Sequence, residues 1–326
     1  MILLKLFTEF LKVGTFSIGA YTGIPLTQEI VLRNAWIDKA MFANMLAISE
    51  STPGPILVNA ATYIGSVKAG FLGSVVATFG VILPAFLVMS LSLLKTADGS
   101  HSLHRDDMGE GYHSTQGAVS EALHVYIRPN LLEKISSCVP SQPINLFEMG
   151  FGTGLNALLT LLESEREGID IRYTTVEMYP LSSEFYTALN YAETCCSLAG
   201  FQEYLSLASR WFLSLHEAAW GEWCCITPHF AIKKLQMDIC TLDFPENSFD
   251  CVYYDAFAPQ FQPDLWTVDL FQRLFYAMRD DAILTTYCCK GDVKRALKTA
   301  GFQIEKIPGF ANKREMLRAK KILCNR

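Results

Sequence analysis

The hydrophobic and polar positions divide the chain into a largely apolar first part and an alternating second part. Residues 71–94 contain no charged side chain, and as a helix this length crosses a bilayer core of about 30 Å. From Thr96 onward, apolar runs of strand length alternate with amphipathic runs of helix length. The pattern predicts an all-α membrane segment over residues 1–95 and an α/β domain with a doubly wound sheet over residues 96–326.

The glycine-rich stretch at residues 147–156 is the centre of the second part. An apolar run enters it, Gly150, Gly152 and Gly154 follow at alternate positions, and an amphipathic run leaves it, which predicts a strand, a tight turn and a helix start. Glycines allow positive φ and close approach of a ligand, and the first helical turn offers free N–H groups. The turn therefore suits a nucleotide-like ligand.

The spacing of this turn narrows the ligand class. Dinucleotide sites use G-x-G-x-x-G, whereas here an acid, Glu148, precedes an alternating G-x-G-x-G. A carboxylate suits a cationic or hydroxyl-rich ligand, and the arrangement resembles the S-adenosylmethionine loop of Rossmann-like methyltransferases. A glycine turn that merely packs a helix on a strand is the alternative. The cofactor-binding residues predicted in this loop are Glu148, Gly150, Gly152, Thr153, Gly154 and Asn156.

Acids and an apolar wall follow the later strands. Glu177, at the end of the second strand, is predicted to bind the ribose hydroxyls, and Asp238, at the end of the third, the adenine amino group. Asp255 ends the fourth strand and is the predicted catalytic residue, which holds an accepting amine and takes its proton. Phe257 and Pro259 are predicted to form an apolar wall for the substrate. Solvated carboxylates and ordinary packing are the alternatives.

Charge and cysteine usage bear on partners. The chain has a net charge of −6, yet residues 290–326 hold 11 basic and 3 acidic side chains, which favours docking of a polyanion there. The candidate phosphate contacts are Lys290, Lys294, Arg295, Lys298, Lys306, Lys313 and Arg314. The ten cysteines include no C-x-x-C pair, so the sequence predicts neither a zinc site nor a redox motif. Reduced thiols fit a cytoplasmic domain.

Residues 1–95 resemble the N-terminal part of chromate transporter family proteins. The resemblance rests on Phe10-Leu11-Lys12-Val13-Gly14, on residues 49–55 with Pro53-Gly54-Pro55, and on Leu83-Pro84-Ala85-Phe86. That family's domain needs several more membrane spans than the one strong span here. The sequence thus predicts a truncated membrane segment, with an oxyanion transporter fragment as the alternative.

Residues 96–321 resemble the methyltransferase domain of the MnmC/MnmD-type tRNA wobble-uridine family. The resemblance is carried by residues 117–127, by the glycine loop, by Glu177-Met178-Tyr179-Pro180-Leu181, by Asp255-Ala256-Phe257-Ala258-Pro259 and by residues 308–317. It implies S-adenosylmethionine as cofactor, no catalytic metal, and methylation of the aminomethyl nitrogen of 5-aminomethyl-2-thiouridine in the tRNA anticodon loop. It also implies substrate binding by Phe257, Pro259, Lys313 and Arg314. A membrane-tethered module that binds cofactor without catalysis is the alternative.

Overall fold

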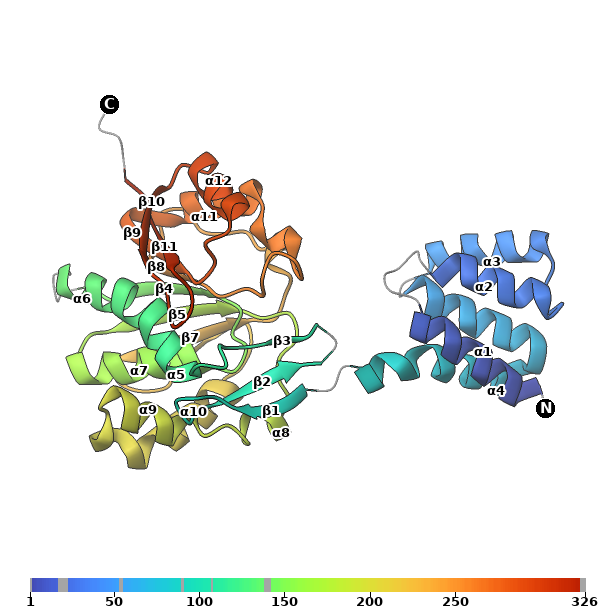
Figure 1. Cartoon of the computed structure of the whole chain (residues 1–326), viewed down its shortest axis with the longest axis horizontal. Coiled ribbons are helices and arrows are strands. Elements are labelled where there is room, and N and C mark those ends of the chain that lie inside the picture. The colour runs from blue at the N-terminus through green and yellow to red at the C-terminus, as the bar shows by residue number, and fades with distance from the viewer. Residues whose placement is uncertain are drawn as a thin grey trace. The chain divides into compact units, whose positions relative to one another are not determined.

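A computed structural model describes residues 2–16, 23–52, 55–88, 91–106, 108–137 and 142–322 of the chain (Figure 1). The chain divides into two compact units, Met1–Ser90 and Leu91–Arg326. The boundary lies before the predicted residue 96 because strand β1 (Leu91–Lys95) pairs with β2 (His101–Arg105) of the second unit.

The first unit is built from helices. They are α1 (Ile2–Phe16), α2 (Gly23–Arg33), α3 (Lys39–Ser51) and α4 (Ile56–Val88). Its core contains Leu6, Phe10, Trp36, Phe42 and Ile64. The buried Glu9 of α1 forms an ion pair with Arg33 of α2 at 3.4 Å. This charged position of α1 therefore contacts another helix of the same unit.

Helix α4 is a helical hairpin and not one straight helix. The chain reverses at Ala69 and Gly70, where φ is −146° and 61°. The Thr62 and Thr78 hydroxyls meet at 2.7 Å, and Gly65 and Gly73 face each other so closely that a Cβ on Gly65 would lie 2.2 Å from the Gly73 carbonyl oxygen. By length and composition alone, residues 56–84 are long and apolar enough for one membrane-spanning helix. The kink, however, divides them into two shorter helical arms.

The single span predicted over residues 71–94 is therefore wrong. The second arm of α4 ends at Val88, and Leu91–Lys95 is strand β1. The apolar residues Leu91, Leu93 and Leu94 at the end of this uncharged run lie in the strand and not in a helix. An uncharged run alone does not distinguish one long helix from a helix followed by a strand.

Replacing Gly73 with leucine is expected to open the hairpin. A Cβ at this position would lie 2.1 Å from the Gly65 carbonyl oxygen, so the arms must separate. We expect a loss of about 1–3 kcal/mol, which corresponds to roughly 5- to 150-fold faster amide hydrogen exchange across residues 56–88. Ser66→Leu, at an exposed position of the same helix, is the matched control and should leave exchange unchanged. Equal protection in both variants would contradict this packing.

The second unit begins with a small antiparallel sheet of β1, β2 and β3 (Glu110–Gly111). Leu103 is buried in the main core, and the turn before β2 is fixed by Asp98, whose carboxylate accepts from Ser100 N at 3.0 Å. The polar residues from Thr96 and the charges from Arg105 indicate a linker or domain start near residue 96. The structure has an ordered sheet there, whose ladder pairs residues 91–95 with residues 101–105.

The main sheet has eight strands in the order β10-β11-β9-β8-β4-β5-β7-β6. Their bounds are β4 (Ile144–Met149), β5 (Ile171–Val176), β6 (Trp223–Cys225), β7 (Phe230–Leu235), β8 (Phe249–Tyr254), β9 (Met278–Thr286), β10 (Gln303–Pro308) and β11 (Glu315–Lys320). The five strands β7, β5, β4, β8 and β9 are parallel. The α/β fold class is confirmed, but β6 and β11 run antiparallel to their neighbours because short turns connect them to β7 and β10.

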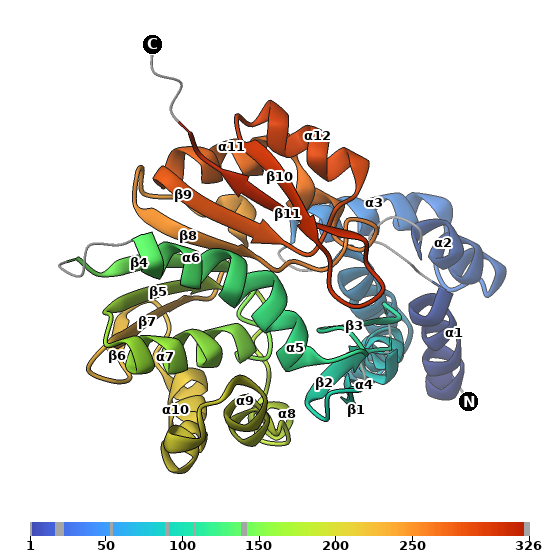
Figure 2. The same ribbon diagram turned by 60° about the vertical axis from the view of Figure 1, so that its left-hand side comes forward.

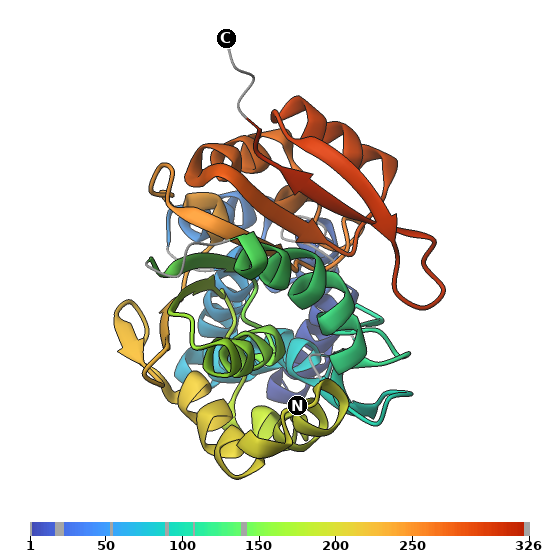
Figure 3. The same ribbon diagram turned by 90° about the vertical axis from the view of Figure 1, so that its left-hand side faces the viewer.

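Helices cover both faces of this sheet (Figures 2 and 3). One face carries α11 (Val268–Ala277) and α12 (Gly291–Thr299). The other carries α5 (Ala118–Ala122), the π-helix η1 (Leu123–Leu132), α6 (Glu133–Ser137), α7 (Leu155–Glu167), α9 (Tyr191–Ala199) and α10 (Leu205–Glu217). Strand β4 shows the division, since Leu146 packs on the second face and Phe147 on the first.

Two segments after β5 differ from what their sequence indicates. The pattern of residues 181–191 indicates one helix, but the structure has a short α8 (Ser183–Tyr186) followed by α9 from Tyr191. Asn190 interrupts the helix because its side chain binds the small sheet, accepting from His101 N at 2.8 Å and donating to the Gly99 carbonyl at 3.0 Å. Residues 195–230 fit the strand–helix alternation badly and indicate an inserted helical cover, but they contain α10 and also the edge strand β6.

Candidate functional site

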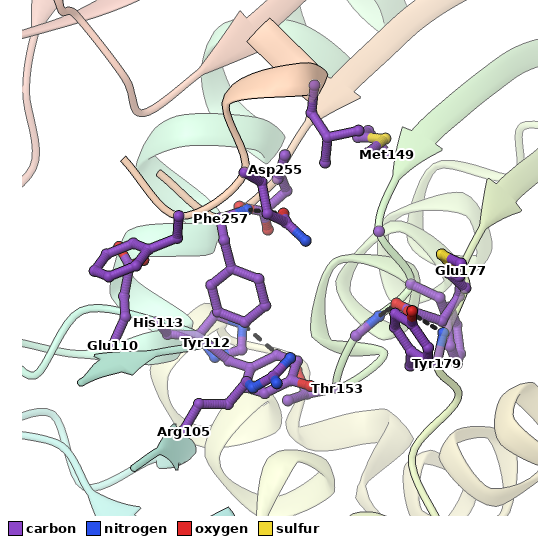
Figure 4. A pocket seen from close by; sticks show the side chains of 18 of the residues that line it. Arg105, Glu110, Tyr112, His113, Met149, Thr153, Glu177, Tyr179, Asp255 and Phe257 are labelled. Atoms are coloured by element: carbon purple, nitrogen blue, oxygen red, sulfur yellow. Dashed lines mark hydrogen bonds between the residues drawn. The ribbon is translucent and has the colours of Figure 1, made fainter. Parts of the chain in front are cut away.

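The carboxyl ends of the parallel strands open into a cavity of about 890 Å³ (Figure 4). The loops after β4, β5, β7 and β8 form its floor, as expected at the edge where a doubly wound sheet binds ligands. Arg105 and residues 110–115, from the small sheet and the loop after it, form another wall. Nine of the side chains or backbone positions predicted from the sequence line this cavity: Gly150, Gly152, Thr153, Asn156, Glu177, Asp238, Asp255, Phe257 and Lys313.

The glycine loop adopts the conformation that its composition predicts. Gly150 and Gly152 have φ of 85° and 50°, which side chains other than glycine rarely adopt. A Cβ on Gly150 would lie 3.3 Å from the Asp255 carbonyl oxygen, and one on Gly152 would lie 3.3 Å from the Tyr112 ring. The backbone therefore lines the cavity at positions where a side chain would crowd two neighbouring walls.

Glu177 and Asp238 lie at the ends of β5 and β7. Glu177 accepts from Gly152 N at 3.1 Å and from Tyr179 N at 2.8 Å, so its carboxylate is fixed against the glycine loop. Burial raises the pKa of Glu177 above its ordinary value. Asp238 accepts from Cys240 N at 2.9 Å and begins the short turn η3 (Ile239–Thr241). Both carboxylates retain lone pairs that face the cavity.

Asp255 is the most strongly held carboxyl in the cavity. Tyr126 Oη donates to Asp255 Oδ1 at 2.6 Å, and Asn156 Nδ2 donates to Oδ2 at 2.9 Å. Burial raises the pKa of Asp255 to about 7, although both hydrogen bonds and Lys313 oppose that rise. A carboxyl with this pKa changes charge near neutral pH, as a general base requires.

Phe257 and Lys313 lie on the wall beyond Asp255. The Phe257 ring meets Tyr112 edge to face at 5.1 Å between centroids. Lys313 places its ammonium 4.4 Å from the Tyr287 ring centroid and 3.4 Å from Glu121 Oε1. The cavity thus has an aromatic wall with Lys313 and Arg105 beside it, and Arg105 lies 5.9 Å from the Phe257 ring centroid. In Figure 4 the Phe257 side of this wall lies opposite Glu177 and Tyr179.

Four predicted residues do not line the cavity. Glu148 lies under its floor, 1 % exposed, because the alternation of β4 turns its side chain into the core. Gly154 begins α7 and faces His216. Pro259 lies in a turn closed by the Ala258 carbonyl, which accepts from Phe261 N, and the exposed Arg314 lies in the turn between β10 and β11.

The small sheet and the loop after it bring functional side chains that the sequence analysis missed. Arg105, Glu110, Tyr112 and His113 all line the cavity. Glu110 has a buried oxygen, Oε2, without a hydrogen-bond partner among the described residues, and burial raises its pKa. Burial lowers the pKa of His113 to about 4, so this ring is neutral. The dense run of polar and aromatic residues at 101–114 was the available signal.

The basic residues near the C-terminus are divided between ion pairs and solvent. Lys294 and Lys306 both pair with Glu315 at 3.1 Å, and Arg295 pairs with Asp292. Lys290 donates to Gln260, and Arg314 is exposed. Lys313 is the member of this group that lines the cavity.

The arrangement can bind a ligand with hydroxyl groups and an apolar body, and can accept a proton beside it. Two carboxylates, Glu177 and Asp238, lie at the strand ends, and the apolar Met149 and Ile239 line the same cavity. Asp255, whose pKa is raised to about 7, lies where these strand ends, the cofactor groove, meet the aromatic wall.

Comparisons with known proteins find a different family in each part of the chain. Residues 4–106 match the family model described as chromate transporter, and residues 215–322 match the family described as S-adenosyl-L-methionine-dependent methyltransferase. Each match covers about a third of the chain. The two resemblances predicted from the sequence are confirmed.

Curated relatives match the second unit. The tRNA 5-methylaminomethyl-2-thiouridine biosynthesis bifunctional protein MnmC of Nitrosospira multiformis is 30 % identical over 226 residues, which cover 66 % of this chain and 34 % of that protein. Its namesake from Aeromonas salmonicida is 31 % identical over 233 residues, 66 % and 33 % of the two chains. This chain thus spans about a third of the length of these relatives.

A solved structure has the same fold. The crystal structure of MnmC2 from Aquifex aeolicus superposes with a TM-score of 0.55 at 24 % identity, covering 74 % of this chain and 76 % of that one. At this identity the likeness establishes the fold.

Proposed function

We propose that the second unit transfers a methyl group from S-adenosylmethionine to the aminomethyl nitrogen of 5-aminomethyl-2-thiouridine at the tRNA wobble position. The observation that carries the proposal is Asp255, which lies where the cofactor groove meets the aromatic wall and whose pKa is about 7. The matches to the methyltransferase family and to the MnmC proteins support the same reaction.

The cavity fits S-adenosylmethionine. The glycine backbone at Gly150 and Gly152 leaves room for the ligand that a Cβ would fill. Glu177 would hold the ribose hydroxyls, and Asp238 would accept from the adenine amino group between Met237 and Ile239. Thr153 completes the cofactor-binding set, whereas Asn156, predicted for the same set, holds Asp255 with its amide nitrogen. When bound, the cofactor supplies an electrophilic methyl group on a sulfonium.

Asp255 positions the amine and takes its proton. Tyr126 and Asn156 each occupy one lone pair of its carboxylate, and the remaining lone pairs can accept from the substrate amine. The nitrogen lone pair is then aligned toward the cofactor, and the proton released on methylation passes to the carboxylate. Phe257 would wall the uridine, and Lys313, with the exposed Arg314 in the same turn, would contact the RNA backbone.

The test is labelled-methyl transfer from S-adenosylmethionine by the full chain. Incorporation into tRNA that carries the aminomethyl wobble base, with none into tRNA lacking it, is the expected result. Cofactor binding without transfer to either tRNA would instead favour the binding-module alternative. A shortened chain should begin at residue 91, since a start at residue 96 removes β1.

For the first unit we propose that the α4 hairpin inserts into a membrane from one side without crossing it. Its arms of about 20 and 27 Å are shorter than a bilayer core of about 30 Å. Phe71, Leu72, Val75 and Phe79 are exposed on the second arm, and Phe71 is 81 % exposed. The chromate transporter match is consistent with an origin in a membrane protein.

Flotation with lipid vesicles tests this insertion. The full chain should float with vesicles, and replacing Phe71, Leu72 and Phe79 together by serine should return it to the soluble fraction. Serine at the exposed Leu198 and Leu213 of the second unit is the control for lost apolar surface. Flotation that is equal in both variants would refute the proposal.

A further inference from the structure

Glu148 is a buried acid for which the proposed reaction has no use. It lies directly beneath the cavity floor, 1 % exposed, and Thr175 Oγ1 donates to its Oε2 at 3.0 Å. The other groups that interact with it are Tyr173 on β5, Tyr253 on β8, Asn156 on α7 and Asp255 after β8. No cation is among these neighbours, so an ionised Glu148 would lie uncompensated beside the Asp255 carboxyl.

Asn156 joins Glu148 to the site. Its amide nitrogen donates to Asp255 Oδ2 at 2.9 Å, whereas its amide oxygen is buried and has no hydrogen-bond partner among the described residues. A buried amide oxygen without a partner costs about 1–3 kcal/mol. If the amide turned over, its oxygen would face the Asp255 carboxylate and the donor would be lost. The direction of this amide therefore needs a donor on its other side.

The Glu148 carboxyl is the group placed to supply that donor. Thr175 donates to one of its oxygens, and the buried Tyr173 hydroxyl, which has no hydrogen-bond partner among the described residues, also interacts with the carboxyl. Burial, followed by the charge of Asp255, raises the pKa of Glu148 well above its ordinary value, against side-chain hydrogen bonds with Tyr173, Thr175 and Asn156, so the neutral acid is favoured. Two neighbouring carboxyls do not both ionise readily.

We infer that Glu148 is a positioning residue whose carboxylic acid donates to Asn156 Oδ1 and so keeps the Asn156 amide donor on Asp255. This inference rests on the proposed methyl transfer for its kinetic consequence only. It replaces the cofactor contact that the sequence analysis predicted for Glu148. A group in this position acts on the proton acceptor through another side chain and leaves cofactor affinity unchanged.

The test compares Glu148→Gln with Glu148→Leu in the full chain. Glutamine keeps a neutral donor toward Asn156, so kcat is expected to stay within about threefold of the wild type with the same pH profile. Leucine removes the donor, so kcat is expected to fall about 10- to 100-fold, with the dissociation constant of S-adenosylmethionine within about threefold. A carboxylate that bound the cofactor's amino group would instead weaken cofactor binding about tenfold or more in Glu148→Gln, which would overturn the inference.

Infrared spectroscopy provides a readout that does not depend on turnover. At neutral pH a buried Glu148 acid should give a carbonyl stretch that disappears in Glu148→Gln. Absence of this band in the wild type would refute the inference even if methyl transfer is active. If the band is present but the chain methylates no tRNA, the proposed function is refuted, whereas the protonated state of Glu148 is supported.

Discussion

Asp255→Asn is expected to lower kcat for methyl transfer by about 10²- to 10⁴-fold, the usual contribution of a positioned general base. Asparagine keeps the size of the side chain but cannot take the proton from the amine. Its amide nitrogen would also face the donor of either Tyr126 or Asn156, which now bind the two carboxylate oxygens. The dissociation constant of S-adenosylmethionine should change less than about tenfold because Glu177 and the glycine loop are untouched.

Asp269→Asn is the matched control for this variant. Asp269 is exposed in the first turn of α11 and does not line the cavity, so the same chemical change there should leave kcat unaltered. Rapid-quench measurement of one turnover separates methyl transfer from product release. Wild-type rates in Asp255→Asn would remove this residue from catalysis.

The local pattern of the sequence was sufficient to predict the floor of the site. The glycine loop, Glu177 and Asp255 each lie at the end of an apolar strand, and the carboxyl ends of adjacent parallel strands meet at one edge whatever the rest of the chain does. The positions of these residues follow from strand order and chain direction alone.

The walls depend on contacts that sequence spacing does not encode. The small sheet carries Arg105, Glu110 and Tyr112 to the cavity through pairing between segments that read as a polar linker. Glu148 was assigned to the cofactor because it precedes the glycines, but the twofold alternation of β4 turns it into the core. The predicted span began at residue 71, directly after the kink at Gly70, but its end was wrong because hydropathy alone does not separate a helix from a helix followed by a strand.

The pH dependence of the reaction should identify the same carboxyl. The pKa of Asp255 is raised to about 7, and its ionised form is the one that accepts a proton, so activity is retained above that pH and lost below it. With saturating tRNA, kcat/KM for S-adenosylmethionine should fall about tenfold per pH unit below about pH 7, or roughly 100-fold at pH 5. Radiolabelled-methyl incorporation across this range measures the slope.

The Asp255→Asn variant distinguishes protonation of Asp255 from protonation of the tRNA amine. In this variant the fall in rate below pH 7 that is due to Asp255 should disappear, and any pH dependence that remains is due to the substrate amine. Asp269→Asn should keep the complete wild-type profile because its carboxyl is exposed and remote from the cavity. A wild-type profile that is flat down to pH 5 would mean that the proton leaves the amine by another route, and Asp255 would then serve to orient the amine by hydrogen bonding alone.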